Sequence, residues 1–145
     1  MSAESEELVK KATELRTSGR IEEAILAARR ATTVDPEDAN AWWQLALAVA
    51  RKDGDATAAS HFKRVVELAD HYAYGWYRLG RAYKKAGMTD EAVIAWETAV
   101  EKDDEQTDAM EELVEIYRSR EREGDKEKLF SALKKLDQKN SISAF

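Results

Sequence analysis

A repeat of 34 residues constrains this sequence more than any other feature. Large apolar residues recur at this step, as in the column formed by Leu8, Trp42, Trp76 and Met110. The other columns are Leu45, Leu79 and Leu113; Leu15, Val49, Tyr83 and Tyr117; Ala24, Ala58 and Ala92; Ala28, Phe62 and Trp96; and Ala31, Val65 and Ala99. Within a repeat the apolar residues follow the i, i+3, i+4, i+7 spacing of amphipathic helices. Each repeat is therefore predicted to form a pair of helices.

Glycines separate the two helices of each predicted pair. Gly19, Gly54 and Gly87 fall between the apolar segments, and glycine suits the left-handed residue that ends a helix. Because one pair cannot bury its apolar face alone, successive pairs must stack on one another. The predicted helices are 5–17, 21–33, 39–52, 55–69, 73–86, 89–102, 107–121 and 125–138.

The third repeat carries the most specific motif. Trp76-x-x-Leu79-Gly80-x-x-Tyr83, followed by Ala92-x-x-x-Trp96, resembles the tetratricopeptide repeat (TPR) pattern. The resemblance implies an all-α fold, a right-handed α-solenoid of helix-turn-helix hairpins with about eight helices in a single domain. The expected repeats are 5–38, 39–72 and 73–106, followed by a degenerate capping hairpin at 107–138 and a frayed tail at 139–145.

Composition excludes several classes of function. The chain has no cysteine, which excludes disulfides and thiolate metal sites, and its net charge of -6 argues against nucleic acid and anionic membranes as partners. His61 and His71 lack metal-ligand spacing, and neither a phosphate-binding loop nor a nucleophile elbow occurs. We therefore expect no enzymatic activity, no cofactor and no metal.

The apolar segments indicate where in the cell the protein is expected. The first residues are polar and lack the apolar centre of a signal peptide. The most apolar stretch, residues 41–50, is too short to span a bilayer. The expected location is the cytoplasm.

The resemblance also implies where a partner binds. In TPR proteins the first helices of the repeats line a concave groove that commonly takes peptides. The repeat register implies a partner-binding role for Trp43, Leu47, Tyr74, Tyr77, Arg78, Arg81 and Lys85. Exposed aromatic residues on such a face are candidate binding anchors. Trp43 has a structural alternative, which is to pack half-buried against the first helix of the next repeat.

A basic stripe lies on the same predicted face. Arg78, Arg81 and Lys85 are spaced i, i+3 and i+7, so one helix face presents all three. Arginine holds carboxylates with paired hydrogen bonds, which suggests a protein or peptide partner with acidic as well as apolar groups. As alternatives, Lys85 suits the negative end of the helix dipole, and Arg78 could pair with Glu112.

A comparison with one class of TPR domain narrows the possible class of ligand. TPR domains that hold chaperone C-terminal tails use a two-carboxylate clamp, and its positions correspond here to Val9, Thr13, Gln44, Tyr74 and Arg78. Arg78 matches the clamp and Gln44 matches it loosely. The sequence therefore looks unlike that class of chaperone co-factor.

Three functions follow as hypotheses. The first is an adapter that binds a peptide or partner domain in the groove. The second is a self-assembling scaffold that forms a homo-oligomer through its end faces. The third is the regulatory part of a larger complex. The residues that would serve self-assembly are Leu129, Phe130, Leu133, Ile142 and Phe145.

Overall fold

The computed structural model describes residues 2–120 and 122–143, with side chains described to residue 140. All regular structure within these residues is helical. The elements are α1 (Ala3–Thr17), α2 (Ile21–Val34), α3 (Ala39–Asp53), the 3₁₀ turn η1 (Ala56–Ala58), α4 (Ala59–Leu68), α5 (Ala73–Lys85), α6 (Thr89–Lys102), α7 (Thr107–Arg120) and α8 (Asp125–Ser143). The predicted all-α helical-repeat solenoid is confirmed.

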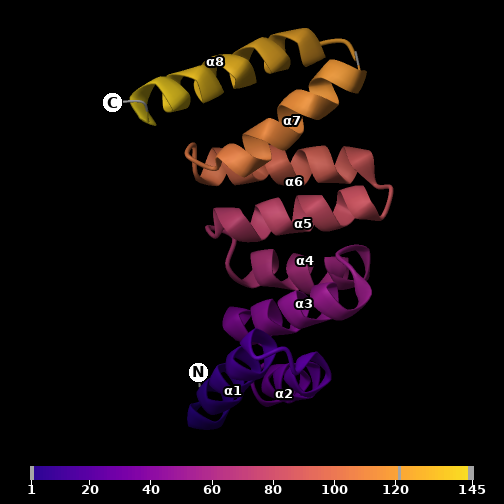
Figure 1. Cartoon of the computed structure of the whole chain (residues 1–145), viewed down its shortest axis with the longest axis vertical. Helices are drawn as coiled ribbons and strands as arrows, with labels where there is room; N and C mark the ends of the chain where they lie inside the picture. The colour runs from indigo at the N-terminus through magenta and orange to yellow at the C-terminus, as the bar shows by residue number, and fades with distance from the viewer. Residues whose placement is uncertain (1, 121, 144–145) are drawn as a thin grey trace.

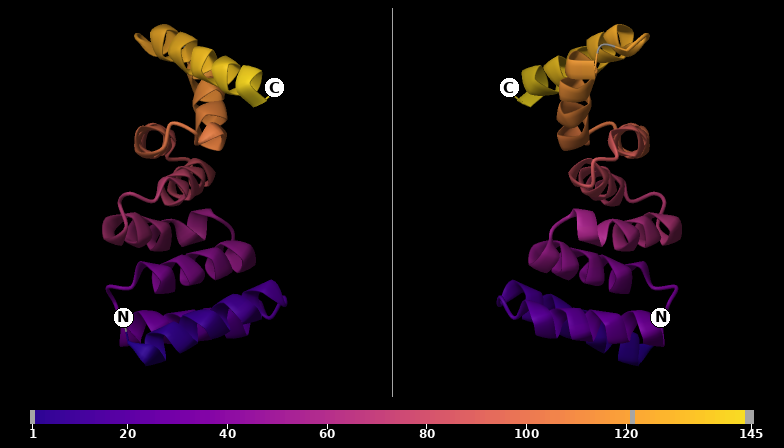
Figure 2. Two further views of the ribbon diagram at one scale, coloured as in Figure 1. Left: turned by 90° about the vertical axis from the view of Figure 1, so that its left-hand side faces the viewer. Right: turned by 90° about the vertical axis from the view of Figure 1, so that its right-hand side faces the viewer.

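Consecutive helices form antiparallel hairpins that stack into a column (Figure 1). Seen from the side, α3, α5 and α7 lie toward one side of the column and α4 and α6 toward the other, whereas α1 and α2 overlap in this view (Figure 2). The column curves toward the side of the first helices. We call the surface that α1, α3, α5 and α7 form on this side the inner face.

The turns within the hairpins depend on glycine, as predicted. Gly19 and Gly87 have φ angles of 86° and 79°, in the left-handed region that side chains other than glycine rarely adopt. At α5 the amide of Gly87 donates to the carbonyl of Lys84, and the amide of Met88 donates to the carbonyl of Tyr83. These bonds satisfy carbonyls that the helix end leaves without partners.

The core runs the length of the column, and its small residues let the helices pack closely. Ala12, Ala24, Ala46, Ala58 and Ala92 are each at most 1% exposed. Larger side chains, including Phe62 and Trp96, are completely buried between them. At the first junction the hydroxyl of Ser5 donates to the carboxylate of Asp38 over 3.2 Å. Because both side chains are buried, this bond ties α1 to the start of α3.

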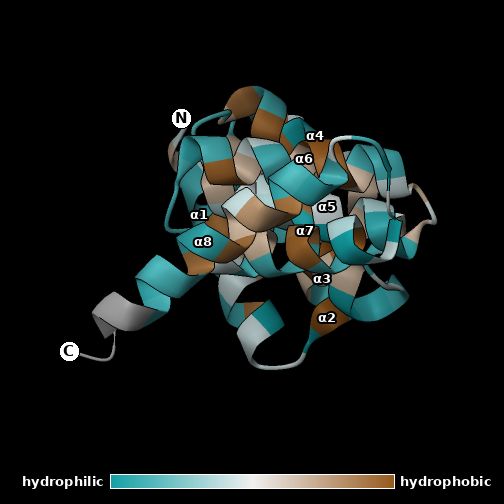
Figure 3. Cartoon of the chain, turned by 90° about the horizontal axis from the view of Figure 1, so that it is seen from above, coloured by the Kyte–Doolittle hydropathy of each residue, from teal (hydrophilic) through white to brown (hydrophobic). Residues whose placement is uncertain are grey.

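Two helix boundaries differ from the prediction by more than two residues. The segment after Gly54 begins as the short turn η1, so α4 starts at Ala59 and not at residue 55. At the other end α8 continues to Ser143, where the sequence analysis ended the helix at 138 and expected a frayed tail. Seen from above, α8 extends beyond the outline of the other helices (Figure 3). Phe145 lies outside the described residues, as does the side chain of Ile142.

Candidate partner-binding surface

Aromatic rings gather on the inner face where the second and third hairpins meet. The ring of Trp43, on α3, lies edge-on to three others, with centroid distances of 5.7 Å to Phe62, 5.3 Å to Tyr72 and 5.8 Å to Tyr74. Trp43 is therefore half-buried and packs partly on the next hairpin, which is the structural alternative that the sequence left open. A part of its ring remains exposed to solvent.

The aromatic row continues along α5. Tyr74 stacks on Tyr77 with centroids 5.6 Å apart and ring planes inclined by 29°. Burial raises the pKa of the Tyr77 hydroxyl, and the negative charge of Asp108 on α7 raises it further. Both phenols are half-buried, so each presents an apolar ring edge and a polar tip. Leu47 is also half-buried and packs against the core cluster beneath.

Two of the predicted arginines share one carboxylate. The Nη2 atom of Arg78 lies 3.5 Å from one oxygen of Asp55, and the Nε atom of Arg81 lies 2.8 Å from the other. The Arg78 guanidinium also lies over the ring of Phe62, 5.0 Å from its centroid. The Arg78 side chain is 14% exposed and that of Asp55 is 11% exposed, whereas that of Arg81 is 49% exposed. Arg78 is thus largely inside the protein and Arg81 reaches the surface.

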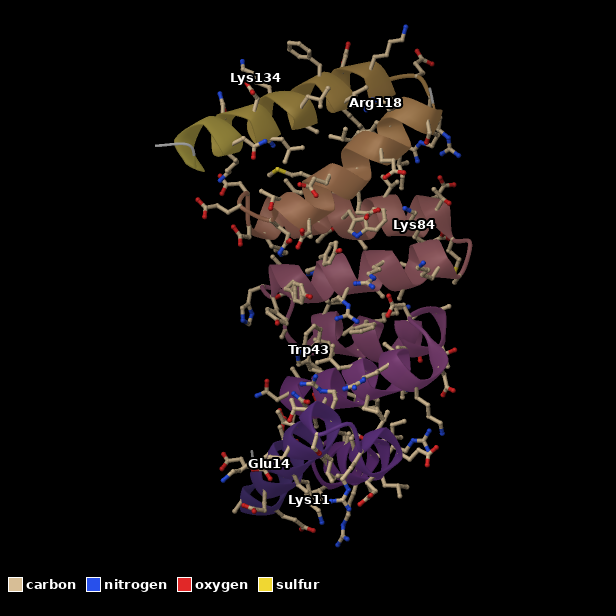
Figure 4. All side chains as sticks on the ribbon, viewed as in Figure 1. Lys11, Glu14, Trp43, Lys84, Arg118 and Lys134 are labelled. Atoms are coloured by element: carbon tan, nitrogen blue, oxygen red, sulfur yellow. The ribbon has the colours of Figure 1, made fainter. Side chains whose placement is uncertain are left out.

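The alternative in which Arg78 pairs with Glu112 is wrong, because Arg78 pairs with Asp55 and Glu112 pairs with Lys84. Lys84 Nζ lies 3.0 Å from Glu112 Oε2, and it also lies over the ring of Trp96. Figure 4 labels Lys84 toward the end of α5 and Trp43 toward the start of α3. Around Lys84 the surface forms an open hollow of about 550 Å³. The hollow is lined by Tyr77, Arg81, Lys84, Lys85, Trp96 and Glu112.

Further arginines border the same face in the first two hairpins. The Nε atom of Arg16 donates to the side-chain oxygen of Gln44 over 3.3 Å. Arg51 donates from Nη1 to the backbone carbonyl of Arg16 over 2.8 Å. Arg51 is exposed and Arg16 is half-buried. Arg51 thus binds the C-terminal end of α1, where carbonyls lack partners within the helix.

The structure thus divides the seven predicted residues into groups. Trp43, Tyr74 and Tyr77 belong to one aromatic row, Arg78 and Arg81 meet at Asp55, and Lys85 borders the hollow beside Lys84. Leu47 contributes to the packing beneath. The sequence did not point to Asp55 or Tyr72, whereas it had already placed Gln44 at a clamp position. Asp55 follows a helix-ending glycine, a place where an acidic residue usually serves the turn.

Neither a metal-ligand cluster nor a membrane-spanning helix occurs in the part of the chain that the structure describes. No group of three or more histidine or acidic side chains there converges as metal ligands. No helix in that part of the chain combines the length and the hydropathy that crossing a membrane requires.

Solved structures with the same fold include TPR proteins. The crystal structure of MamA shares 24% identity with this chain at a TM-score of 0.81, covering 94% of this chain and 81% of MamA. The first TPR domain of Spaghetti (RPAP3), bound to the HSP90 peptide SRMEEVD, shares 24% identity at a TM-score of 0.77, covering 84% and 97%. YrrB, described as a TPR protein with an unusual peptide-binding site, shares 20% identity at a TM-score of 0.67, covering 74% and 55%.

Sequence comparisons agree with the fold. No curated protein matches the sequence significantly. Two family models do match, both described as tetratricopeptide repeat, one over residues 9–73 and the other over residues 73–105. Together they span more than half of the chain, including the repeat with the Trp76 motif. The chain belongs to the tetratricopeptide repeat family.

Proposed function

We propose that this chain is an adapter whose inner face binds a peptide or an extended segment of a partner protein, rather than an enzyme. The observation that carries the proposal is that an aromatic surface and a basic surface adjoin on the inner face. The aromatic row from Trp43 to Tyr77 leads directly to the guanidinium groups of Arg78 and Arg81. Aromatic and arginine side chains are the residues that dominate binding energy at protein interfaces.

The chemistry of this face sets the class of ligand. Half-buried rings offer apolar contact area with little loss of side-chain entropy. Arg81, Lys84 and Lys85 offer positive charge at the next turns of α5. A segment that carries an apolar residue a few positions from an acidic one suits this face. Binding of such a segment to the inner face needs no nucleic acid, membrane or cofactor. A role as a cytoplasmic scaffold is consistent with this kind of binding.

Two structural relatives support peptide binding in general. The TPR domain of Spaghetti holds an HSP90 peptide, and YrrB is described as having a peptide-binding site. The HSP90 tail is not our candidate ligand. Val9 and Thr13 stand where the chaperone-binding clamp needs a lysine and an asparagine, and Tyr74 stands where it needs a second lysine.

A peptide-display selection tests the proposal. Random peptides are selected on the immobilised native chain, and the enriched peptides are measured on purified variants by fluorescence anisotropy. We expect Tyr77→Ala combined with Arg81→Glu to weaken binding at least tenfold. The control is Ile94→Ser on α6, because that side chain is 63% exposed on the opposite side of the hairpin. Enriched peptides that bind the inner-face variant as well as the native chain would place the site elsewhere.

Self-association through an end face is the second candidate. On α8 the side chains of Phe130 and Leu133 are 73% and 39% exposed, and exposed apolar patches are typical of surfaces that bind another protein. Analytical ultracentrifugation over a wide concentration range measures this directly. Concentration-dependent association that Phe130→Ser removes and Ile94→Ser retains would support it, and a monomer at all concentrations would exclude it.

A further inference from the structure

A groove of the same register opens between successive second helices of the column. Leu79 lies on its floor between α4 and α6, and Leu113 lies 34 residues later on its floor between α6 and α8. The preceding second helix forms one wall, with Val66 in the first case and Val100 in the second. At both junctions an apolar residue of a second helix therefore lines the same groove as a leucine of the next first helix.

The first hairpin forms one half of such a groove. A hollow of about 270 Å³ has a floor of Leu8, Lys11 and Leu15 from α1, and its wall contains Leu26 from α2. Each of these residues precedes its counterpart in the groove between α4 and α6 by 68 residues, so Leu26 corresponds to Ile94. No helix of the described residues supplies the second wall, and Leu26 is 67% exposed. The hollow thus has the register of half a junction.

Helix α8 keeps the register of the earlier second helices with a step of 37 residues. Gly124 precedes α8 as Gly87 precedes α6, and the two glycines have φ angles of 85° and 79°. Ala132 lines the groove between α6 and α8 at the place that Ala95 has in the groove before it. Both pairs differ by 37 residues. This step identifies which residue of α8 corresponds to each residue of α6.

One face of α8 matches the face of α6 that joins the next hairpin. In α6 this face includes Val93, which is buried in the core cluster shared with α7, and Val100, which packs against that cluster. The residues 37 positions later are Phe130 and Asp137, and Leu133 lies between them on the same face. Because Phe130 and Leu133 are exposed, α8 presents the other half of a junction. The two halves lie at opposite ends of the column (Figure 1).

Charge distinguishes these two end surfaces from the junctions inside the column. The floor position is leucine in the three later hairpins and Lys11 in the first. The wall position is Thr32, Val66 and Val100 in the earlier second helices and Asp137 in α8. Lys11 and Asp137 are both exposed, and neither forms an ion pair with another described residue. Opposite charges therefore occupy the two positions that would meet if the ends of two copies joined.

We infer that a second copy of this chain stacks head to tail on the first, with α8 of one copy lying in the hollow formed by α1 and α2 of the next. The inference rests on self-association, the second candidate of the proposed function, and it names both surfaces. Phe130 and Leu133 enter the apolar part of the hollow beside Leu26, and Asp137 pairs with Lys11. The contact repeats the packing of an interior junction, so the column continues from one copy into the next.

Charge favours this arrangement over a symmetric contact between two α8 helices. Helix α8 holds five lysines and three acidic residues, a difference of two positive charges, so two copies of α8 repel each other. Helices α1 and α2 together hold six acidic and five basic residues, a difference of one negative charge. The end of the column formed by α1 and α2 is therefore the better partner for α8.

The test blocks each surface separately on the full chain and then mixes the two variants. Leu26→Glu places a charge in the hollow and Phe130→Glu places one on α8, and both residues are exposed, so the fold should remain, which circular dichroism checks. In sedimentation velocity the native chain should grow beyond a dimer as its concentration rises, because a contact between unlike surfaces leaves both kinds free. Each variant alone should associate at least tenfold more weakly, whereas an equimolar mixture should form a dimer and nothing larger.

Two further sets of variants control for charge and position. Ile94→Glu introduces the same charge at the position that corresponds to Leu26 in the third hairpin, where the side chain is 63% exposed, and it should associate as the native chain does. Lys11→Glu and Asp137→Lys should each weaken association several-fold. The two changes combined in one chain should restore it, because the ion pair is then reversed and not removed.

The outcomes separate this inference from self-association in general. Loss of association in Phe130→Glu but not in Leu26→Glu would mean that α8 contacts α8, which overturns the inference and leaves self-association. An equal loss in Ile94→Glu would reduce the effect to general charge and would also overturn it. Single charge reversals that the combined variant does not rescue would contradict the pairing of Asp137 with Lys11. A native chain that stays monomeric would contradict both self-association and the inference, while peptide binding by the inner face would be unaffected.

Discussion

Trp96 occupies the space that a side chain on residue 80 would need. A Cβ atom built on Gly80 would lie 2.4 Å from the Nε1 atom of Trp96. The Trp96 side chain is fully buried, and its indole N–H donates to the backbone carbonyl of Tyr77 over 3.0 Å. The close approach of α5 and α6 in the third hairpin therefore depends on the absence of a side chain at residue 80.

Gly80→Ala is expected to destabilise the protein by about 1–3 kcal/mol, because overpacking at a rigid, buried ring forces the helices apart. Alanine is the better helix former by roughly 1 kcal/mol, which offsets only part of this cost. Urea unfolding measures the difference. Gly75→Ala is the matched control on the same helix, since a Cβ atom there would meet nothing closer than 3.1 Å. A Gly80→Ala variant at least as stable as the Gly75→Ala variant would contradict the packing argument.

Trp42 and Trp76 each donate an indole hydrogen bond to the turn that precedes their helix. The indole N–H of Trp42 donates to the carbonyl of Pro36, and that of Trp76 donates to the carbonyl of Asp70, each over 2.8 Å. Trp42→Phe and Trp76→Phe should each cost about 0.5–1.5 kcal/mol of unfolding free energy through the lost hydrogen bond. The control is Trp43→Phe, because the Trp43 indole donates no hydrogen bond within the described residues. Equal losses in all three variants would show that ring volume matters and the bonds do not.

The turn between α7 and α8 predicts a dependence of stability on pH. Hydrogen bonds from the Arg120 side chain lower the pKa of the Asp125 carboxyl, and the backbone N–H of Arg122 lowers it further. Because the folded pKa lies below the unfolded value of about 3.9, the carboxylate stabilises the fold above that pH. This contribution is lost as the pH falls through the folded pKa.

Asp125→Asn should therefore destabilise the protein at about pH 7, and the difference from the native chain should shrink below about pH 3. Urea unfolding at both pH values measures it. Asp137→Asn, at an exposed position on the same helix, should change stability little at either pH. A difference for Asp125→Asn that is constant with pH would mean that the charge of the carboxylate is not involved.

The repeat made the helices and turns predictable from the sequence. The column of Leu8, Trp42, Trp76 and Met110 repeats at a fixed step, so it fixes the register of every hairpin without knowledge of any single contact. The end of α8 was not predictable in this way. No glycine or proline follows residue 138, so nothing in the sequence marks where that helix stops.

The inner face was predictable only in part. The register placed Tyr74, Tyr77, Arg78 and Arg81 on one helix, and the structure brings them to one surface. The partner of an arginine, however, depends on which long side chain reaches it. Lys84 reaches Glu112, and Arg78 instead contacts Asp55 from the preceding turn. A helical pattern carries no information on such contacts between elements.

Site-specific photo-crosslinking tests the central claim, that the inner face is the binding surface, most directly. A photoreactive phenylalanine derivative replaces Tyr74 on the inner face or Ile94 on the opposite side, and both proteins are irradiated with peptides enriched by display on the native chain. We predict that the derivative at Tyr74 crosslinks these peptides and that the derivative at Ile94 does not. Crosslinking from Ile94 with none from Tyr74 would contradict the account.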